Sequence, residues 1–155
     1  MLNRQLLVII WVLVAGLSAC STAPEKEQGF EVGDDAQTSD RILPDRRTSK
    51  TVLALLDNAR SAANLGQLSK SESQLERAMR IEPRNAVLWH YLAKLRLLQE
   101  RTDEAAELAA RSNSLARKNR KLMAGNWQII AHARYQNGDM AGAQKAQQKV
   151  EQFKK

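Results

Sequence analysis

Side chains able to do chemistry or bind a metal are few in this sequence. It holds two histidines, His90 and His132, and a zinc site built on them would need further histidine, aspartate or glutamate ligands nearby. Their neighbours Lys94, Gln128 and Gln136 are poor metal ligands. We therefore expect this pair to bind no metal ion.

Motifs for catalysis or cofactor binding are not found elsewhere in the sequence. There is no Gly-rich phosphate loop, no His-Glu-x-x-His motif and no serine, histidine and aspartate set. Gly66, Gly125, Gly138 and Gly142 are spaced as in turns and close helix contacts. We predict a protein that is not an enzyme, with no catalytic residue and no cofactor.

The single cysteine, Cys20, excludes an internal disulfide and a cysteine-rich zinc or iron–sulfur site. Before it come Arg4 and an uncharged apolar run at residues 6–16, which is too short to span about 30 Å of hydrocarbon. The tetrapeptide at residues 17–20, Leu-Ser-Ala-Cys, resembles the lipobox of bacterial lipoproteins, in which cleavage precedes the cysteine. The alternatives are an uncleaved membrane anchor and an ordinary secretory signal.

The lipobox resemblance implies where the mature chain begins and where it resides. Residues 1–19 would be a signal peptide, and Cys20 would carry a diacylglyceryl thioether and an N-acyl chain. Several acyl chains on one residue make membrane attachment effectively permanent. Ser21, in place of aspartate, implies sorting to the outer membrane, with the chain facing the periplasm.

Residues 20–47 are predicted to be the lipidated cysteine and a flexible tether. Prolines and glycines at positions 24, 29, 33 and 44 interrupt this segment, which has almost no apolar periodicity and so cannot bury enough surface to order itself. A flexible chain of this length spans about 30 Å on average. Residues 21–50 sum to a charge of −2, whereas 18 bases stand against 10 acids after residue 50.

Five cations form a basic cluster in the C-terminal part: Arg111, Arg117, Lys118, Arg120 and Lys121. At the end of a helix and in an enlarged turn, they would complement the negative end of the helix dipole. The other interpretation is an anion-facing patch. For an exported lipoprotein the candidate ligands are lipid phosphates, cell-wall carboxylates or an acidic protein surface, and nucleic acid is not expected.

The elements that position these residues are predicted to be helices throughout residues 48–155. A chain of 155 residues with only 5% aromatic residues fits one modest domain of the all-α class. Apolar residues recur at spacings of three and four after residue 50. Breaks at residues 64–66, 82–85, 100–103, 117–121 and 137–139 divide this part into about six helices in three hairpins. Thr102 or Asp103 is the expected N-cap of the fourth helix, with Glu104 and Glu107 in its first turn.

These hairpins resemble the tetratricopeptide repeat, whose 34-residue pattern is W-x2-L-G-x2-Y, then A-x3-F and a final proline. The repeats fall at about 52–85, 86–123 and 124–155, with four extra residues around residues 117–121. The matching positions are Gly66, Leu75, Ala78 and Pro83 in the first repeat, Trp89, Leu92, Ala93 and Ala105 in the second, and Trp127, Ile130, Ala131, Gly138 and Ala143 in the third. The resemblance implies a short right-handed solenoid, in which alanines allow close helix approach and the two tryptophans fill space between neighbouring hairpins.

In tetratricopeptide proteins the first helices of the repeats line a concave face that binds partners. On this chain the resemblance places the following candidate partner-binding residues there: Arg60, Asn64, His90, Lys94, Gln128, His132 and Tyr135. Such a groove could hold an extended acidic peptide through ion pairs and hydrogen bonds.

A lipoprotein with an acidic tether and about three such repeats resembles the LpoP-type activators of class A, bifunctional penicillin-binding proteins. The resemblance implies that the chain reaches from the outer membrane, binds the periplasmic part of such a synthase and shifts it toward an active conformation. The alternative is a non-enzymatic scaffold or pilotin-like lipoprotein of an outer-membrane assembly such as a pilus secretin. A third class, a peptidoglycan-binding module, lacks the expected cluster of sugar-binding aromatic residues.

Overall fold

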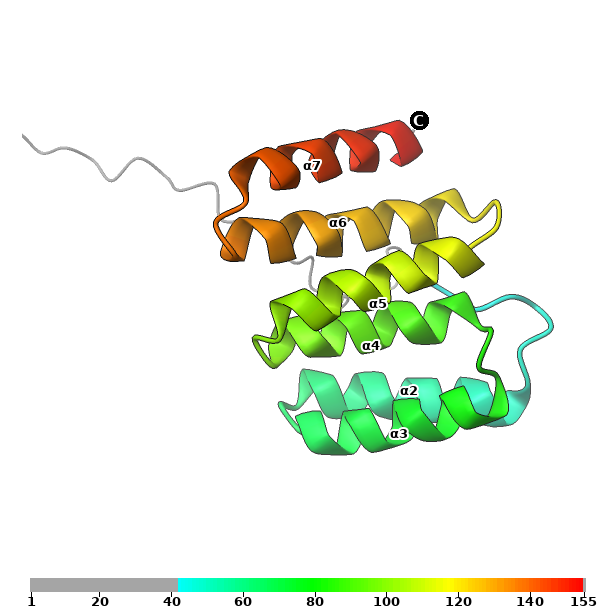
Figure 1. Ribbon diagram of the computed structural model, residues 1–155. Helices are drawn as coiled ribbons and strands as arrows, with labels where there is room; N and C mark the ends of the chain where they lie inside the picture. The colour runs from blue at the N-terminus through cyan, green and yellow to red at the C-terminus, as the bar shows by residue number, and fades with distance from the viewer. Residues whose placement is uncertain (1–41, 155) are drawn as a thin grey trace, which may run out of the picture. The chain divides into compact units, whose positions relative to one another are not determined.

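The computed structural model describes residues 42–154, and all regular secondary structure in that range is helical (Figure 1). The helices are α2 (Lys50–Asn64), α3 (Leu68–Ile81), α4 (Ala86–Leu98), α5 (Thr102–Leu115), α6 (Arg120–Gln136) and α7 (Met140–Lys154). The predicted signal peptide, Cys20 and the tether up to residue 41 lie outside the described residues, as does Lys155.

Local sequence signals account for most of the helix ends. Gly66 and Gly138, at φ +70° and +79°, form the left-handed turns that end α2 and α6. Ser49, Asn85 and Asn119 each accept a hydrogen bond from a backbone N–H in the first turn of α2, α4 and α6. Each predicted break overlaps the turn between two helices, but residues 102–103 and 120–121, predicted to lie in breaks, belong to α5 and α6.

The start of α5 differs from the prediction. Arg101 occupies the N-cap position and makes no capping side-chain bond. Thr102 Oγ1 instead donates to Asn137 Oδ1 at 2.6 Å, and Asn137 Nδ2 donates to Asp103 Oδ1 at 2.6 Å. The two expected capping side chains therefore bind the α6–α7 turn, because a tertiary partner competes successfully for them. Glu104 lies in the first turn as expected, whereas Glu107 lies beyond it.

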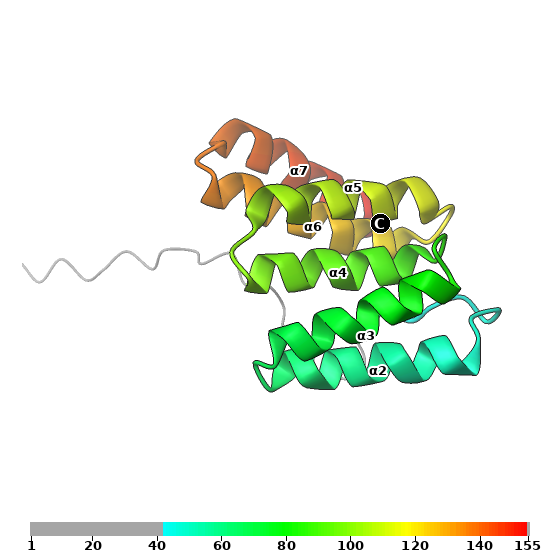
Figure 2. The same cartoon turned by 60° about the horizontal axis from the view of Figure 1, so that its bottom comes forward.

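The helices pair as α2–α3, α4–α5 and α6–α7, and the central hairpin lies between the other two (Figures 1 and 2). This all-α stack is the predicted solenoid of tetratricopeptide type. Its core contains large apolar side chains at no more than 2% exposure: Leu75, Leu88, Leu95 and Leu122. Burying each of them contributes about 1.5–3 kcal/mol. Ala93, Ala105 and Ala131 are at most 1% exposed and allow close helix approach, as the repeat pattern predicts.

Three details of the repeat pattern differ in the structure. Trp89 and Trp127 are only half-buried, and Trp89 Nε1 donates to the carbonyl of Pro83 at 2.8 Å. Ala143 is half-buried, because α7 turns Gly142 and Ala146 toward the core instead. As the terminal helix, α7 packs only on α6 among the described helices, so the repeat template does not constrain its rotation.

The extra residues between the second and third repeats lengthen a helix and do not enlarge a turn. Asn119 caps α6 through the N–H of Leu122 at 3.0 Å, so that α6 has 17 residues where α4 has 13. Arg120 and Lys121 consequently lie in the first turn of α6.

Candidate functional site

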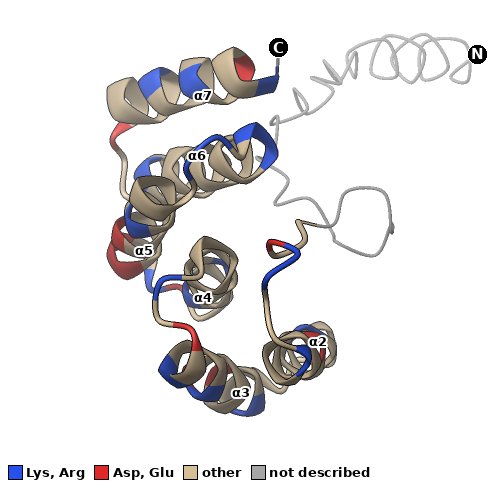
Figure 3. Ribbon diagram, turned by 90° about the vertical axis from the view of Figure 1, so that its right-hand side faces the viewer, with Lys and Arg blue, Asp and Glu red and all other residues tan. Residues whose placement is uncertain are grey.

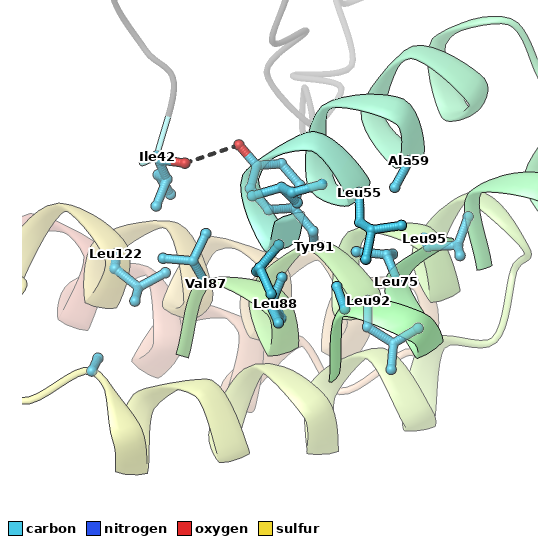
Figure 4. Close-up of a cluster of buried hydrophobic side chains, with 14 residues drawn as sticks. Ile42, Leu55, Ala59, Leu75, Val87, Leu88, Tyr91, Leu92, Leu95 and Leu122 are labelled. Carbon is cyan, nitrogen blue, oxygen red and sulfur yellow. Dashed lines mark hydrogen bonds between the residues drawn. The ribbon is translucent and has the colours of Figure 1, made fainter. Parts of the chain in front are cut away.

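Part of the predicted partner-binding groove is filled by the chain itself. Figure 3 shows α2, α4 and α6 around the segment that precedes α2. Ile42, at the start of that segment, is 9% exposed and belongs to the hydrophobic core. Tyr91 Oη donates to the carbonyl of Ile42 at 3.2 Å (Figure 4). Ile42 falls within the sequence predicted as tether, so the packed part of the chain begins before residue 48.

Gly125 of α6 makes room for this contact. A Cβ atom there would lie 2.9 Å from Ile42 Cδ1 and 3.1 Å from His90 Cε1, closer than side-chain atoms normally approach. The glycine therefore serves the packing of Ile42 against α6. The sequence analysis identified a close helix contact at Gly125 but could not name the group that approaches it.

His90 belongs to a buried polar network between helices. It is 4% exposed, and its Nδ1 lies 2.8 Å from Asn126 Oδ1. Asn126 Nδ2 donates to Ser112 Oγ at 2.8 Å and to Asn113 Oδ1 at 3.0 Å. Because the amide oxygen only accepts, Nδ1 of His90 must donate. The expected partner-facing role does not fit this burial, and a structural role linking α4 to α5 and α6 does.

The other predicted groove residues also lie on α2, α4 and α6. The Arg60 guanidinium is 5.3 Å from the Tyr91 ring centroid and 3.5 Å from Asp57 Oδ1. Lys94, Gln128 and His132 are half-buried, whereas Asn64 and Tyr135 are exposed near helix ends. Their helices are the first helices of the three hairpins, and the role of these residues in binding stays a prediction.

A second candidate surface is a cleft of about 860 Å³ at one end of the hairpins, which we call the basic cleft. Three segments far apart in the sequence line it: the chain before α2, the α3–α4 turn and the α5–α6 turn, all on the right-hand side of Figure 1. The lining residues are Leu43–Thr48, Glu82–Val87, Leu115–Asn119 and Leu122.

Hydrogen bonds hold two walls of the basic cleft together. The Ser49 N–H donates to Glu82 Oε1 at 2.8 Å, and Asn85 Nδ2 donates to Glu82 Oε2 at 2.8 Å and to Thr48 Oγ1 at 3.1 Å. Burial raises the pKa of Glu82, but these hydrogen bonds outweigh it and the net shift of the pKa is downward. Glu82 is thus an anion already bound by the protein.

The predicted basic cluster divides between structural and cleft residues. Arg111 lies over the Trp89 ring at 5.7 Å, and Arg120 lies over the Phe153 ring at 5.7 Å while donating to the Gln152 carbonyl at 2.8 Å. Arg117 and Lys118 line the basic cleft.

The interpretation of the cluster as a complement to the helix dipole fails for two of its members. Arg120 and Lys121 lie at the N-terminus of α6, where positive charge is unfavourable. The sequence analysis also missed Arg46, Arg47 and Arg84, which join Arg117 and Lys118 only through the fold.

Two further searches concern the described residues 42–154 alone. No set of three histidine, cysteine, aspartate or glutamate side chains is grouped there so as to hold a metal ion. None of the helices in this range has the length and apolarity to cross a membrane.

Comparison with known proteins found a similarity to a domain of known structure. No family model matches the chain, and no curated protein matches it. The solved structure of the globular C-terminal domain of P. aeruginosa LpoP is similar, with 40% sequence identity and a TM-score of 0.65. The match covers 66% of this chain and 97% of that domain.

Proposed function

Since the chain belongs to the family of LpoP-type proteins, we propose that it binds a class A, bifunctional penicillin-binding protein in the periplasm and stimulates peptidoglycan synthesis. The observation that carries this proposal is the 40% identity over 97% of the LpoP domain, with the same fold. The role is that of a non-enzymatic regulator. It acts by binding the active conformation of the synthase more tightly than the inactive one, which shifts the population of the synthase.

The proposal includes membrane attachment. Residues 1–19 would be removed as a signal peptide, lipidated Cys20 would hold the chain in the outer membrane, and residues 21–41 would connect it to the packed domain. Fully extended, those residues reach about 70 Å, so the domain can meet a synthase at a distance from its own anchor. Attachment also raises the effective concentration of the domain near the cell wall.

The test uses purified components. The soluble chain, residues 21–155, is added to the class A synthase of the same organism, and glycan polymerisation and peptide crosslinking are measured. We expect both binding and an increased rate, and the same chain after thermal denaturation is the control. A chain that neither binds nor stimulates any class A synthase of its organism would contradict the proposal. Crosslinking in the intact envelope followed by identification of the captured protein would then test the secretin scaffold directly.

A further inference from the structure

We propose that the basic cleft is the docking surface for an extended acidic segment of the partner protein, one that carries an apolar side chain. The identification of that partner as a synthase rests on the proposed function. The chemistry of the segment follows from the cleft alone.

The cleft carries more positive charge than its own acids neutralise. Five cations line it, Arg46, Arg47, Arg84, Arg117 and Lys118, against two acids. Asp45 is already paired, with its Oδ2 3.4 Å from Arg47 Nη2, and Glu82 accepts from Ser49 and Asn85. Among residues 42–154, no carboxylate pairs with the other four cations. Anions can therefore bind them without displacing a carboxylate of the described residues.

Folding does not explain these cations. Arg84, Arg117 and Lys118 are exposed, and none of them makes a hydrogen bond with another described residue. Arg117 has a φ of +51°, a backbone conformation in which glycine or asparagine costs less than arginine. A chain selected only for this turn would carry a smaller residue there, so the charge itself accounts better for the arginine.

Exposed apolar surface beside the cations favours a peptide over a simple anion as the ligand. Val87, Ala116 and Leu122 also line the cleft, but each is at most 5% exposed. Leu43 stands at the rim with 62% of its surface exposed. A hydrated phosphate gains nothing from the exposed Leu43 side chain, whereas a peptide can pack an apolar side chain against it.

The volume of the cleft and the spread of its cations also favour a peptide over a single phosphate. A volume of about 860 Å³ holds several residues, and the cations come from three separate segments along it. Tight binding of one phosphate would need the donors to converge on one point. An extended chain with carboxylates on both sides of an apolar residue matches cations spread over a rim.

The first arm of the test measures the cleft without any synthase. The probe is a synthetic peptide of about twelve residues, rich in glutamate with a central leucine, and the matched peptide has glutamine at every glutamate. The protein is the soluble chain, residues 21–155. We expect the triple variant Arg84→Glu, Arg117→Glu and Lys118→Glu to bind the acidic probe at least about tenfold more weakly. A matched reversal at exposed Lys70, Arg77 and Lys145 should change binding less than about twofold.

Four results would overturn the proposal. One is equal binding of the acidic and glutamine peptides, and another is unchanged binding by the triple variant. The third is binding of the acidic peptide only after residues 21–41 are removed. These residues hold six acids against two bases, and such a result would mean that they occupy the cleft themselves. Loss of probe binding in Lys94→Glu alone would assign the segment to the concave face and likewise exclude the cleft.

The second arm repeats the comparison with the class A synthase. The triple variant should lose about tenfold in synthase binding while its helical circular dichroism stays unchanged. If the unmodified chain binds the probe but does not stimulate any synthase, the proposed function is contradicted, while the assignment of the cleft as a peptide-binding surface still holds. Stimulation that survives in the triple variant would contradict the cleft as the synthase docking surface and leave the proposed function intact.

Discussion

At the residue scale, two positions on α4 show that a side chain on the inner face of a repeat can bind another part of the same chain. His90 and Tyr91 are neighbours, with ring centroids 5.2 Å apart, and both are buried. His90 bonds across to Asn126 of α6, and Tyr91 bonds to the backbone of Ile42. A polar side chain on the inner face of a repeat therefore need not face a partner protein. The next repeat, or the segment before the first repeat, can provide its hydrogen bond.

Asn126→Ala tests the buried network. The change leaves the hydrogen-bonding groups of His90 and Ser112 buried without Asn126, and it opens a small cavity. We expect a loss of about 2–4 kcal/mol in the free energy of unfolding, measured by urea denaturation of residues 42–155. Asn58→Ala, at an exposed position of α2, is the matched control and should cost less than about 0.5 kcal/mol. Equal effects of the two changes would mean that the network contributes no stability.

Ile42→Ala tests whether the segment before α2 is part of the packed domain. Ile42 is 9% exposed and Leu43, next to it, is 62% exposed, so the two positions form a natural pair. We expect Ile42→Ala to destabilise by about 1–2 kcal/mol and to speed amide hydrogen exchange in residues 43–48. Leu43→Ala should leave both measurements nearly unchanged. Indistinguishable variants would place Ile42 outside the core in solution.

At the scale of elements, a polar network joins three consecutive helices, α3, α4 and α5. Arg96 Nη2 of α4 lies 2.7 Å from Glu72 Oε1 of α3, and Arg96 Nε lies 3.4 Å from Glu104 Oε2 of α5. Gln99 Nε2 donates to the second oxygen of Glu72 at 3.0 Å. Arg96 is 9% exposed, so its charge depends on these partners for stabilisation.

This network predicts a dependence of stability on pH. Hydrogen bonds from Arg96 and Gln99 lower the pKa of Glu72 from its ordinary value of 4.5, despite the opposing effect of burial. The carboxylate therefore stabilises the fold above that ordinary value, and its contribution is lost as the pH falls through the lowered pKa. Glu72→Gln should cost about 1–2 kcal/mol near neutral pH and less at acid pH, as urea denaturation across pH will measure. Glu76→Gln, exposed on the same helix, should cost little at any pH.

At the scale of the whole molecule, the chain combines a proposed membrane anchor with a packed domain that has the proposed docking surface at one end. The segment before α2 contributes to the core and to the basic cleft. Ile42 lies in the core, and residues 43–48 line the cleft. The proposed tether is therefore joined in sequence to the segment that lines the surface we assign to the partner.

Cys20→Ala tests the anchor. Without the thiol, no thioether to diacylglycerol can form, so we expect labelling with radioactive palmitate to disappear and the protein to leave the outer-membrane fraction. Ser21→Ala, which keeps the cysteine, should retain the label. Label that persists in Cys20→Ala would show that another residue or an uncleaved segment holds the chain in the membrane.

The amino-acid sequence by itself determined the helices, the hairpins and the class of repeat. Gly66, Pro83 and Gly138 stop helices through their own backbone preferences, and the apolar spacing between them needs no distant contact to be recognised. The same locality explains the LpoP-type resemblance, because repeated short patterns and a lipobox can be identified one segment at a time.

Only the tertiary structure decided what the surface residues do. His90 is hydrogen-bonded to Asn126, 36 residues away, and the Tyr91 hydroxyl donates to the Ile42 carbonyl across 49 residues. Arg46, Arg84 and Arg117 meet at one cleft only because three separate segments end on the same edge of the stack. No local preference encodes these contacts, since each depends on how helices pack over long sequence separations, and packing follows from the sum of all buried surfaces.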